Sequence, residues 1–287
     1  MNLEQAYHDY RPLLFSIAYR LLGTVTEAED IVQDVFTSLG TVNWNHIQHP
    51  KAFLCQSVSN RCLNLMKASV KKKERYVGNW LPEPFIHSTD NEPLMALENK
   101  EAVSYAYLVM LETLTPTERI IFVLKTSYAI AYDELAEITG KTEVNCRKIY
   151  SRARQKMKSQ PAVETCPDSK GVMVQRFIEA LHNGNITDLI QLMREDTIIT
   201  TDGGGKVRAA TRQITSIQRI FAFFKGILAK EAFADEMILT QANGSPALMV
   251  KAEGRPKALW LLALTPDASS ISHVYGVLNP DKLPKNI

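Results

Sequence analysis

Residues 133–157 form the stretch that most constrains how this chain folds. They are typical of two short helices around Gly140, with Thr142 at the N-cap of the second helix. Between residues 141 and 158 lie seven cations and one anion, Glu143. A helix-turn-helix presents a helix of this kind to the DNA major groove. The segment therefore favours DNA binding over its alternative, an αα-hairpin with a solvated basic face.

The second helix divides into a packed face and a basic face. Cys146, Ala153 and Met157 recur at helical spacing, with Ile149 or Tyr150 between them, and this pattern predicts the packed face. Recognition helices contact base edges through the N-terminal half of their exposed face. The candidate DNA-reading residues are Asn145, Arg147, Lys148, Ser151 and Arg152.

Composition limits the other classes of protein. The 287 residues suffice for two or three domains, and the net charge of +2 makes any nucleic-acid signal a matter of local clusters. The four cysteines form no CxxC pair and have no paired histidines, so we expect no metal site, no disulfide framework and a reducing compartment. With no signal peptide and no stretch long enough to span a bilayer, the sequence predicts a cytoplasmic protein without a membrane partner.

Residues 1–75 read as an all-α domain. An apolar run from Leu13 to Leu22 ends at Gly23, and Thr26 with Glu29 has the spacing of a capping box for the next helix. That helix, up to Leu39, has one apolar and one acidic face. A third helix is predicted from Pro50 to Met66. The cationic run that follows it is Lys67, Lys71, Lys72, Lys73 and Arg75.

Two linkers separate the remaining parts. Residues 76–100 contain Trp80-Leu81-Pro82-Glu83-Pro84, which cannot lie inside a helix. Helical signals resume at Leu94, and Thr115 with Glu118 forms a second capping box before the helix-turn-helix, in a domain of residues 101–160. A second linker covers residues 161–169. Beyond it, in residues 168–287, helices predicted at 174–181, 189–193 and 217–228 and strands at 233–239, 247–252, 258–264 and 271–277 indicate an α+β domain.

The order of these motifs resembles an extracytoplasmic-function (ECF) sigma factor. Residues 28–36 and 52–64 are similar to two segments of the family's region two, and residues 114–119 and 151–154 are similar to hallmarks of region four. The resemblance implies that residues 1–75 bind core RNA polymerase at the β′ clamp helices, recognise the −10 promoter element and melt the duplex. It implies that residues 101–160 bind the β flap and read the −35 element through the helix-turn-helix.

Site residues follow from that resemblance. Cations are needed for phosphates, and the amide of Asn60 could contact a flipped base. The −10 candidates are Asn60, Arg61, Asn64, Lys67, Lys71 and Lys72. The polymerase-binding candidates are Asp30, Ile31, Gln33, Asp34 and Phe36.

Three further motifs resemble one ECF group that carries a SnoaL-like C-terminal extension of the cystatin-type cone fold. They are residues 80–84, 202–206 and 279–283. In this group the extension replaces a separate anti-sigma factor and regulates the sigma core in cis. We expect the three segments to meet, because Trp80 and Leu81 are large apolar side chains in a segment that cannot fold alone. The candidate regulatory residues are Trp80, Leu81, Pro82, Asp202, Gly203, Gly204, Gly205, Asn279, Pro280 and Asp281.

Catalysis is the weaker interpretation of the C-terminal domain. Its candidate pocket groups, which show neither the order of a catalytic triad nor metal-ligand spacing, are His182, Asp202, Asp235, His273 and Tyr275. The sequence thus predicts an alternative sigma factor with no enzymatic activity and no cofactor, while an unidentified small ligand of the C-terminal domain stays open. The alternatives are a ligand-sensing helix-turn-helix regulator and a SnoaL-type enzyme fused to a DNA-binding module.

Overall fold

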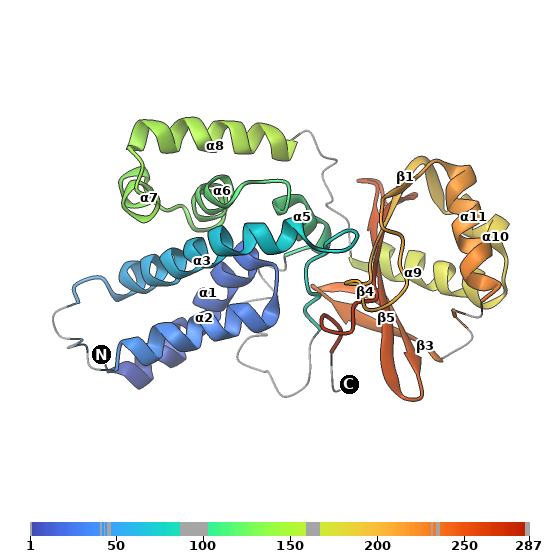
Figure 1. The fold of residues 1–287 in the computed structure, drawn as a ribbon, viewed down its shortest axis with the longest axis horizontal. Coiled ribbons are helices and arrows are strands. Elements are labelled where there is room, and N and C mark those ends of the chain that lie inside the picture. The colour runs from blue at the N-terminus through green and yellow to red at the C-terminus, as the bar shows by residue number, and fades with distance from the viewer. Residues whose placement is uncertain are drawn as a thin grey trace. The chain divides into compact units, whose positions relative to one another are not determined.

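The computed structural model describes residues 2–40, 42, 44, 47–86, 103–158, 167–230, 232–233 and 236–284, without the side chains of residues 71, 72 and 167–169. The chain forms two compact units (Figure 1). The first unit comprises Met1–Glu74, Glu92–Glu101 and Leu108–Gln160. The second comprises Arg75–Asn91, Ala102–Tyr107 and Pro161–Ile287. The segment that follows Glu74 therefore belongs to the C-terminal unit.

The N-terminal part of the first unit consists of α1 (Leu3–Leu22), α2 (Val25–Ser38) and α3 (Pro50–Glu74). α1 contains the apolar run of residues 13–22 and begins ten residues before it, where the Asn2 side chain caps the helix by accepting the Gln5 N–H at 2.8 Å. α3 continues past the predicted end at Met66 through the lysine-rich run, since lysine is a good helix former.

The predicted capping box of α2 is wrong by two residues. Thr24, not Thr26, is the N-cap, and its hydroxyl donates to the Glu27 carboxylate at 2.7 Å. Both threonine–glutamate pairs have the required spacing, so local pattern could not choose between them. Gly23, at φ 73°, ends α1 in the left-handed region and turns the chain at once into α2, which selects the earlier pair.

The rest of the first unit is built from short helices. They are α5 (Tyr105–Leu111), α6 (Pro116–Tyr128), α7 (Tyr132–Thr139) and α8 (Glu143–Lys158). The predicted capping box of α6 is confirmed: the Glu118 carboxylate accepts the Thr115 N–H at 3.0 Å and the Thr115 hydroxyl accepts the Glu118 N–H at 3.4 Å. The helical start predicted at Leu94 lies outside the described residues.

The second unit has the predicted α+β architecture. Its helices are α9 (Pro167–His182), α10 (Ile186–Gln191) and α11 (Ile217–Leu228), and its strands are β1 (Met193–Asp202), β2 (Ile214–Thr215), β3 (Glu236–Ala242), β4 (Ser245–Ala252), β5 (Arg255–Leu264) and β6 (Ile271–Val277). The six strands form one sheet in the order β2-β1-β6-β5-β4-β3. β1 pairs parallel with β6, and the other pairs are antiparallel, so the sheet is mixed.

Apolar side chains, several of them aromatic, fill the space between the helices and one face of this sheet. Phe177, Phe224 and Trp260 lie in a single apolar cluster contributed by α9, α11 and β5. Gly276 pairs with Trp260 across β5 and β6, and a Cβ at position 276 would come within 2.8 Å of the indole. Residues on a strand alternate between faces, so Tyr275 points to the opposite face. Tyr275 is also buried, and the segment after Glu74 runs along that side of the sheet (Figure 1).

Candidate promoter-contacting and linker-binding sites

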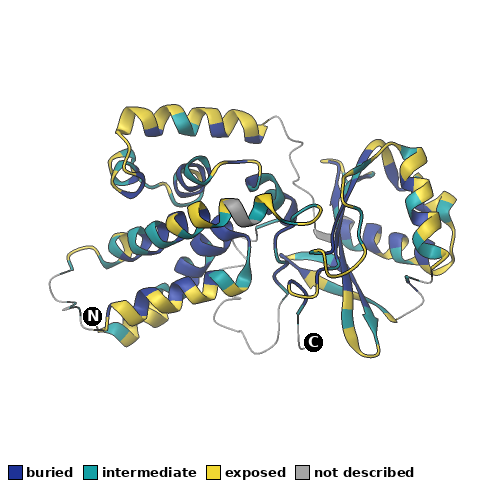
Figure 2. Cartoon of the chain, viewed as in Figure 1, coloured by how far each residue is buried: buried dark blue, intermediate teal, exposed yellow. Residues whose placement is uncertain are grey.

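The helix-turn-helix displays its predicted DNA-reading residues on one exposed face of α8. Gly140, at φ 64°, ends α7 in the left-handed region. Thr142 accepts a hydrogen bond from the Asn145 N–H at 3.3 Å, as an N-cap does. Cys146, Ala153 and Met157 are buried. Most of the remaining surface of α8 is exposed (Figure 2). All five candidates are exposed: Asn145, Arg147, Lys148, Ser151 and Arg152.

Arg147 is held by local contacts that DNA could replace. Its guanidinium carbon lies 4.4 Å from the centroid of the Tyr132 ring, and it pairs with the Glu143 carboxylate at 3.5 Å. The side chains of Arg147 and Glu143 are 60% and 50% exposed. Ion pairs at such exposure contribute only about 0–1 kcal/mol, so Arg147 can change partners at little cost.

The candidates for −10 recognition lie along α3. Asn60 and Arg61 are half-buried, and the Arg61 guanidinium donates to the Ser38 hydroxyl at 2.8 Å. Asn64 and Lys67 are exposed. The side chains of Lys71 and Lys72 lie outside what the structure describes.

The candidates for polymerase binding on α2 divide by burial. Asp30, Gln33 and Asp34 are exposed, whereas Ile31 and Phe36 are buried in the helical core. Phe36 packs edge-to-face on Tyr7 of α1 with 4.9 Å between ring centroids. The first three side chains can meet a partner directly, and the two apolar ones hold the helix in place.

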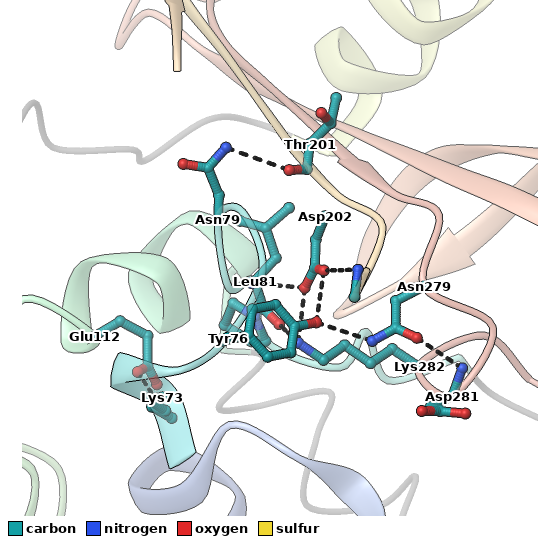
Figure 3. A network of polar contacts seen from close by, with 12 residues as sticks. Lys73, Tyr76, Asn79, Leu81, Glu112, Thr201, Asp202, Asn279, Asp281 and Lys282 are labelled. Atoms are coloured by element: carbon teal, nitrogen blue, oxygen red, sulfur yellow. Dashed lines mark hydrogen bonds and ion pairs between the residues drawn. The ribbon is translucent and has the colours of Figure 1, made fainter. Parts of the chain in front are cut away.

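The carboxylate of Asp202, at the end of β1, is the centre of a polar network in the C-terminal unit (Figure 3). One oxygen accepts from the Tyr76 hydroxyl at 2.7 Å and from the Gly204 N–H at 2.9 Å. The other accepts from the Leu81 N–H at 2.9 Å and from the Lys282 ammonium at 2.7 Å. The Asp202 side chain has 0% exposure. Four donors, one of them a cation, supply what a buried carboxylate needs.

Lys282 completes a clamp on the backbone of Leu81. Its ammonium donates to the Leu81 carbonyl at 2.6 Å and lies 4.1 Å from the centroid of the Trp80 ring. The ion pair of Asp202 and Lys282 thus holds both the N–H and the carbonyl of one residue. Burial, and then the hydrogen bond to Asp202, raise the pKa of Tyr76, which keeps its hydroxyl a donor at neutral pH. We call Tyr76, Trp80, Leu81, Asp202 and Lys282 the linker clamp.

The glycines after Asp202 are required by close packing. A Cβ at Gly203 would collide with the Val207 carbonyl, and one at Gly204 would collide with the Asn279 amide. Gly204 also has φ 61°, which favours glycine. Asn279 in turn donates to the Tyr76 hydroxyl at 2.9 Å. The structure therefore brings together the three segments that the sequence singled out.

Further contacts fasten the linker beyond the clamp. The Asn79 amide donates to the Thr201 carbonyl at 3.3 Å. The Phe85 carbonyl accepts the Asn243 N–H at 2.8 Å, and Ile86 forms an antiparallel bridge with Ala242 of β3. The chain from Tyr76 to Ile86 is thus bound into the C-terminal unit along its length.

The start of α5 is bound to the same segment. The Tyr105 hydroxyl donates to the Pro82 carbonyl at 2.7 Å, and its ring packs edge-to-face on Tyr275 with 5.4 Å between centroids. Sequence reasoning missed Tyr76, Tyr105 and Lys282. Lys282 lay within a recognised motif, but no local signal marks a buried lysine as a clamp.

The polar candidates for a catalytic pocket do not converge. Asp202 is committed to the linker clamp, His182 is exposed, and Asp235 lies outside the described residues. His273 is half-buried and stacks on Tyr275 at 5.9 Å, and burial lowers the pKa of His273.

The described residues hold neither a metal-binding cluster nor a membrane-spanning helix. No group of three His, Cys, Asp or Glu side chains there could hold a metal ion. No helix in the same described ranges has the length and apolarity needed to cross a membrane.

Comparisons with known proteins agree on one family. The models for Sigma-70 region 2 and Sigma-70, region 4 match residues 6–72 and 104–157. The ECF RNA polymerase sigma factor SigJ of Mycobacterium tuberculosis is 31% identical over 95% of this chain and 90% of its own length. The probable ECF RNA polymerase sigma factor SigI of that organism is 27% identical over 98% and 94%. The crystal structure of the M. tuberculosis ECF sigma factor SigJ matches with a TM-score of 0.76 and 30% identity over 96% of each chain.

Proposed function

This chain belongs to the ECF family of RNA polymerase sigma factors, non-enzymatic proteins that direct polymerase to promoters. On that premise we propose that its C-terminal α+β domain regulates the sigma core in cis by binding the linker. Membership of this family argues against the alternative function, a ligand-sensing regulator that binds DNA without polymerase. The observation that carries the proposal is the linker clamp, which holds the backbone of Leu81 between regions two and four.

The bound linker limits how far the two DNA-contacting regions can separate. α3 ends at Glu74, and the Tyr105 hydroxyl at the start of α5 is bonded to the Pro82 carbonyl. The eight residues 75–82 span at most about 28 Å when fully extended. Released, the thirty residues 75–104 could span roughly 100 Å. The −10 and −35 elements lie on one duplex that rises 3.4 Å per base pair, so the DNA and not the protein sets the distance between them. Release of the linker therefore favours simultaneous contact with both elements.

Transcription in vitro with core polymerase tests this regulation. Trp80→Ala removes the ring beneath the Lys282 ammonium, and deletion of residues 279–287 removes the lysine itself. We expect each change to raise transcription and the combined variant to add little, because both release the same contact. Lys206→Ala, which breaks an exposed ion pair with Asp281, is the matched control. Additive effects, or a fall in transcription with either change, would contradict the proposal.

We propose that the exposed face of α8 reads the −35 element. A bidentate arginine–guanine contact contributes about 1–3 kcal/mol of discrimination. Arg147→Ala or Lys148→Ala should lower transcription and relax preference at one or two −35 positions, measured on a library of −35 variants. An equal loss on every sequence would mean that these side chains contact phosphate and do not read bases.

We propose that the acidic face of α2 docks on the β′ clamp helices. Asp30→Ala combined with Asp34→Ala should weaken pull-down of core polymerase without unfolding the domain, since exposed charges contribute only roughly 0–1 kcal/mol each to stability. The matched control is Asp9→Ala on α1, where the carboxylate is also exposed. Wild-type pull-down by the double variant would refute this docking surface.

A further inference from the structure

The guanidinium of Arg147 lies on the ring of Tyr132, a residue that has no part in the proposed reading of the −35 element. The guanidinium carbon is 4.4 Å from the ring centroid. We propose that Tyr132 is a positioning residue: its ring fixes the plane of the Arg147 guanidinium and so makes Arg147 selective for one base of the −35 element. The inference rests on the proposed function, because it takes Arg147 to read a base.

A guanidinium that stacks on a ring keeps its hydrogen-bonding edge free. The N–H groups of Arg147 all lie in one plane, and two of them match the O6 and N7 acceptors of guanine when that plane is aligned with the base. An aromatic ring contacts the face of the cation and occupies none of these donors. Tyr132 and a guanine can therefore hold Arg147 at the same time.

The second local partner of Arg147 acts differently. The Glu143 carboxylate accepts from a terminal nitrogen of the guanidinium at 3.5 Å, so it takes up a donor that a guanine would need. The side chains of Arg147 and Glu143 are 60% and 50% exposed, and DNA can replace so weak an ion pair. The ion pair is exchanged for the base, whereas the contact with the ring can stay.

The backbone places Tyr132 at a fixed point of the helix-turn-helix. Tyr132 is the first residue of α7. Ala129, at φ 54°, ends α6 in the left-handed region. The Glu134 carboxylate accepts the Ala131 N–H at 3.1 Å and so caps the start of α7. These two features fix the turn that immediately precedes Tyr132.

Side chains from the two neighbouring helices hold the ring, which is half-buried. Tyr150 of α8 packs edge-to-face on Tyr132 with 6.3 Å between centroids, and Phe122 of α6 stacks on Tyr150 at 6.1 Å. The Lys125 ammonium of α6 lies 4.7 Å from the centroid of the Tyr132 ring and donates to the Ile130 carbonyl at 2.9 Å. A ring held in this way orders the long side chain of Arg147 before DNA arrives, so less conformational entropy is lost on binding.

Transcription of a library of −35 variants by the full-length chain with core polymerase tests this role. Arg147→Ala first identifies the base pair that Arg147 reads. Tyr132→Leu should then relax the preference at that base pair by about two- to fivefold, the factor that corresponds to an exposed cation–π contact. The preference that depends on Lys148 should stay unchanged. Tyr132→Phe keeps the ring and should keep the wild-type preference at every position.

A double-variant cycle separates positioning from a purely structural role. Once Arg147 has been replaced by alanine, the ring has no guanidinium to position. Adding Tyr132→Leu to Arg147→Ala should therefore cause no further loss of preference. A further loss in the double variant, or equal losses at all −35 positions from a folded Tyr132→Leu protein, would overturn the positioning role.

A fluorinated ring provides the test if Tyr132→Leu unfolds the helix-turn-helix. Tyr132→pentafluorophenylalanine keeps an aromatic ring of similar shape and removes the negative charge from its face, which is what attracts a cation. The preference at the base pair read by Arg147 should fall, and the preferences at the other −35 positions should not. Wild-type preference at that base pair with the fluorinated ring would contradict the inference.

The same library distinguishes failure of this inference from failure of the proposed function. If Arg147→Ala relaxes no −35 position, Arg147 does not read a base, and both the proposed reading and the role of Tyr132 are wrong. If Arg147→Ala relaxes one position while Tyr132→Leu and the fluorinated ring leave it unchanged, only the positioning role is overturned.

Discussion

Glu112 and Asp202 are two carboxylates, the first half-buried and the second fully buried, that join distant segments in different ways. The Glu112 carboxylate pairs with the Arg119 guanidinium at 2.6 Å and with the Lys73 ammonium at 2.5 Å, so it links helices through side chains of opposite charge. Asp202 pairs with one cation and accepts two backbone N–H groups besides the Tyr76 hydroxyl. Glu112 thus binds only charged side chains, whereas Asp202 also binds backbone N–H groups.

Solvent exposure separates the two sites further. The Glu112 and Lys73 side chains are 16% and 35% exposed, whereas those of Asp202 and Lys282 are 0% and 8% exposed. Water screens the first pair, and the second interacts in a low-dielectric interior. A screened helix-to-helix contact can break and reform easily. The linker clamp, which excludes water, fixes which linker residue lies opposite Asp202. Removing only one of its charged partners therefore costs far more free energy.

Asp202→Ala should have the largest effect. It leaves the Lys282 ammonium and the Leu81 N–H buried without their main partner, and breaking a buried pair from one side costs about 3–5 kcal/mol. Hydrogen exchange of peptides from β1 and from residues 76–86 should accelerate accordingly, while peptides from α1–α3 keep wild-type exchange. Unchanged protection of residues 76–86 would show that the clamp does not hold the linker.

Glu112→Gln should have a smaller effect that depends on pH. Burial would raise the pKa of Glu112, but Arg119 and Lys73 outweigh it and lower that pKa. The stabilisation is thus fully present above the ordinary carboxyl value near 4.3 and is lost as pH falls through the lower folded value. At pH 7 we expect a loss of about 1–3 kcal/mol, measured by urea denaturation.

The pH profile itself provides the control for Glu112. Protonated glutamate and glutamine are both neutral, so the wild-type and Glu112→Gln curves should approach each other as pH falls below the ordinary carboxyl value and converge below the lowered folded pKa of Glu112. A difference that stays constant from pH 7 to pH 3 would show that the ion pairs are not its source.

Tyr76→Phe removes one of the four donors to Asp202 and keeps the ring. We expect a loss of about 0.5–1.5 kcal/mol, because the remaining three donors still satisfy the carboxylate. Local hydrogen exchange in residues 76–86 measures it. A loss as large as that of Asp202→Ala would mean that the hydroxyl, and not the clamp on Leu81, holds the linker.

Lys206→Ala should have the smallest effect. Its ion pair with Asp281 lies beside the clamp, but the two side chains are 54% and 61% exposed. Such a pair contributes about 0–1 kcal/mol and weakens further with salt. At high salt the unfolding midpoint of Lys206→Ala should therefore hardly differ from that of the wild type. A large difference would mean that the Lys206–Asp281 pair is part of the buried network of the linker clamp.

Several elements were predictable because residues within a few positions of their ends determine where they begin and end. α11 at Ile217–Leu228 and β6 at Ile271–Val277 were predicted with the bounds that they have. The α6 capping box and the α8 faces likewise follow from spacing and charge alone. β1 was missed, although its Ile and Thr residues favour a strand, since its pairing with β6 is parallel and joins residues at least 75 positions apart, such as Ile198 and His273.

The sequence alone determined the family, the order of the domains and the need of the Trp80–Pro84 segment for a partner surface. Periodicity, caps and prolines act within a few residues, so they can be read along the chain. Only the tertiary structure decided that Asp202 and Lys282 hold the N–H and carbonyl of Leu81 and that α7 lies on α3. Backbone groups are the same in every residue, so which ones become partners depends on how distant segments pack.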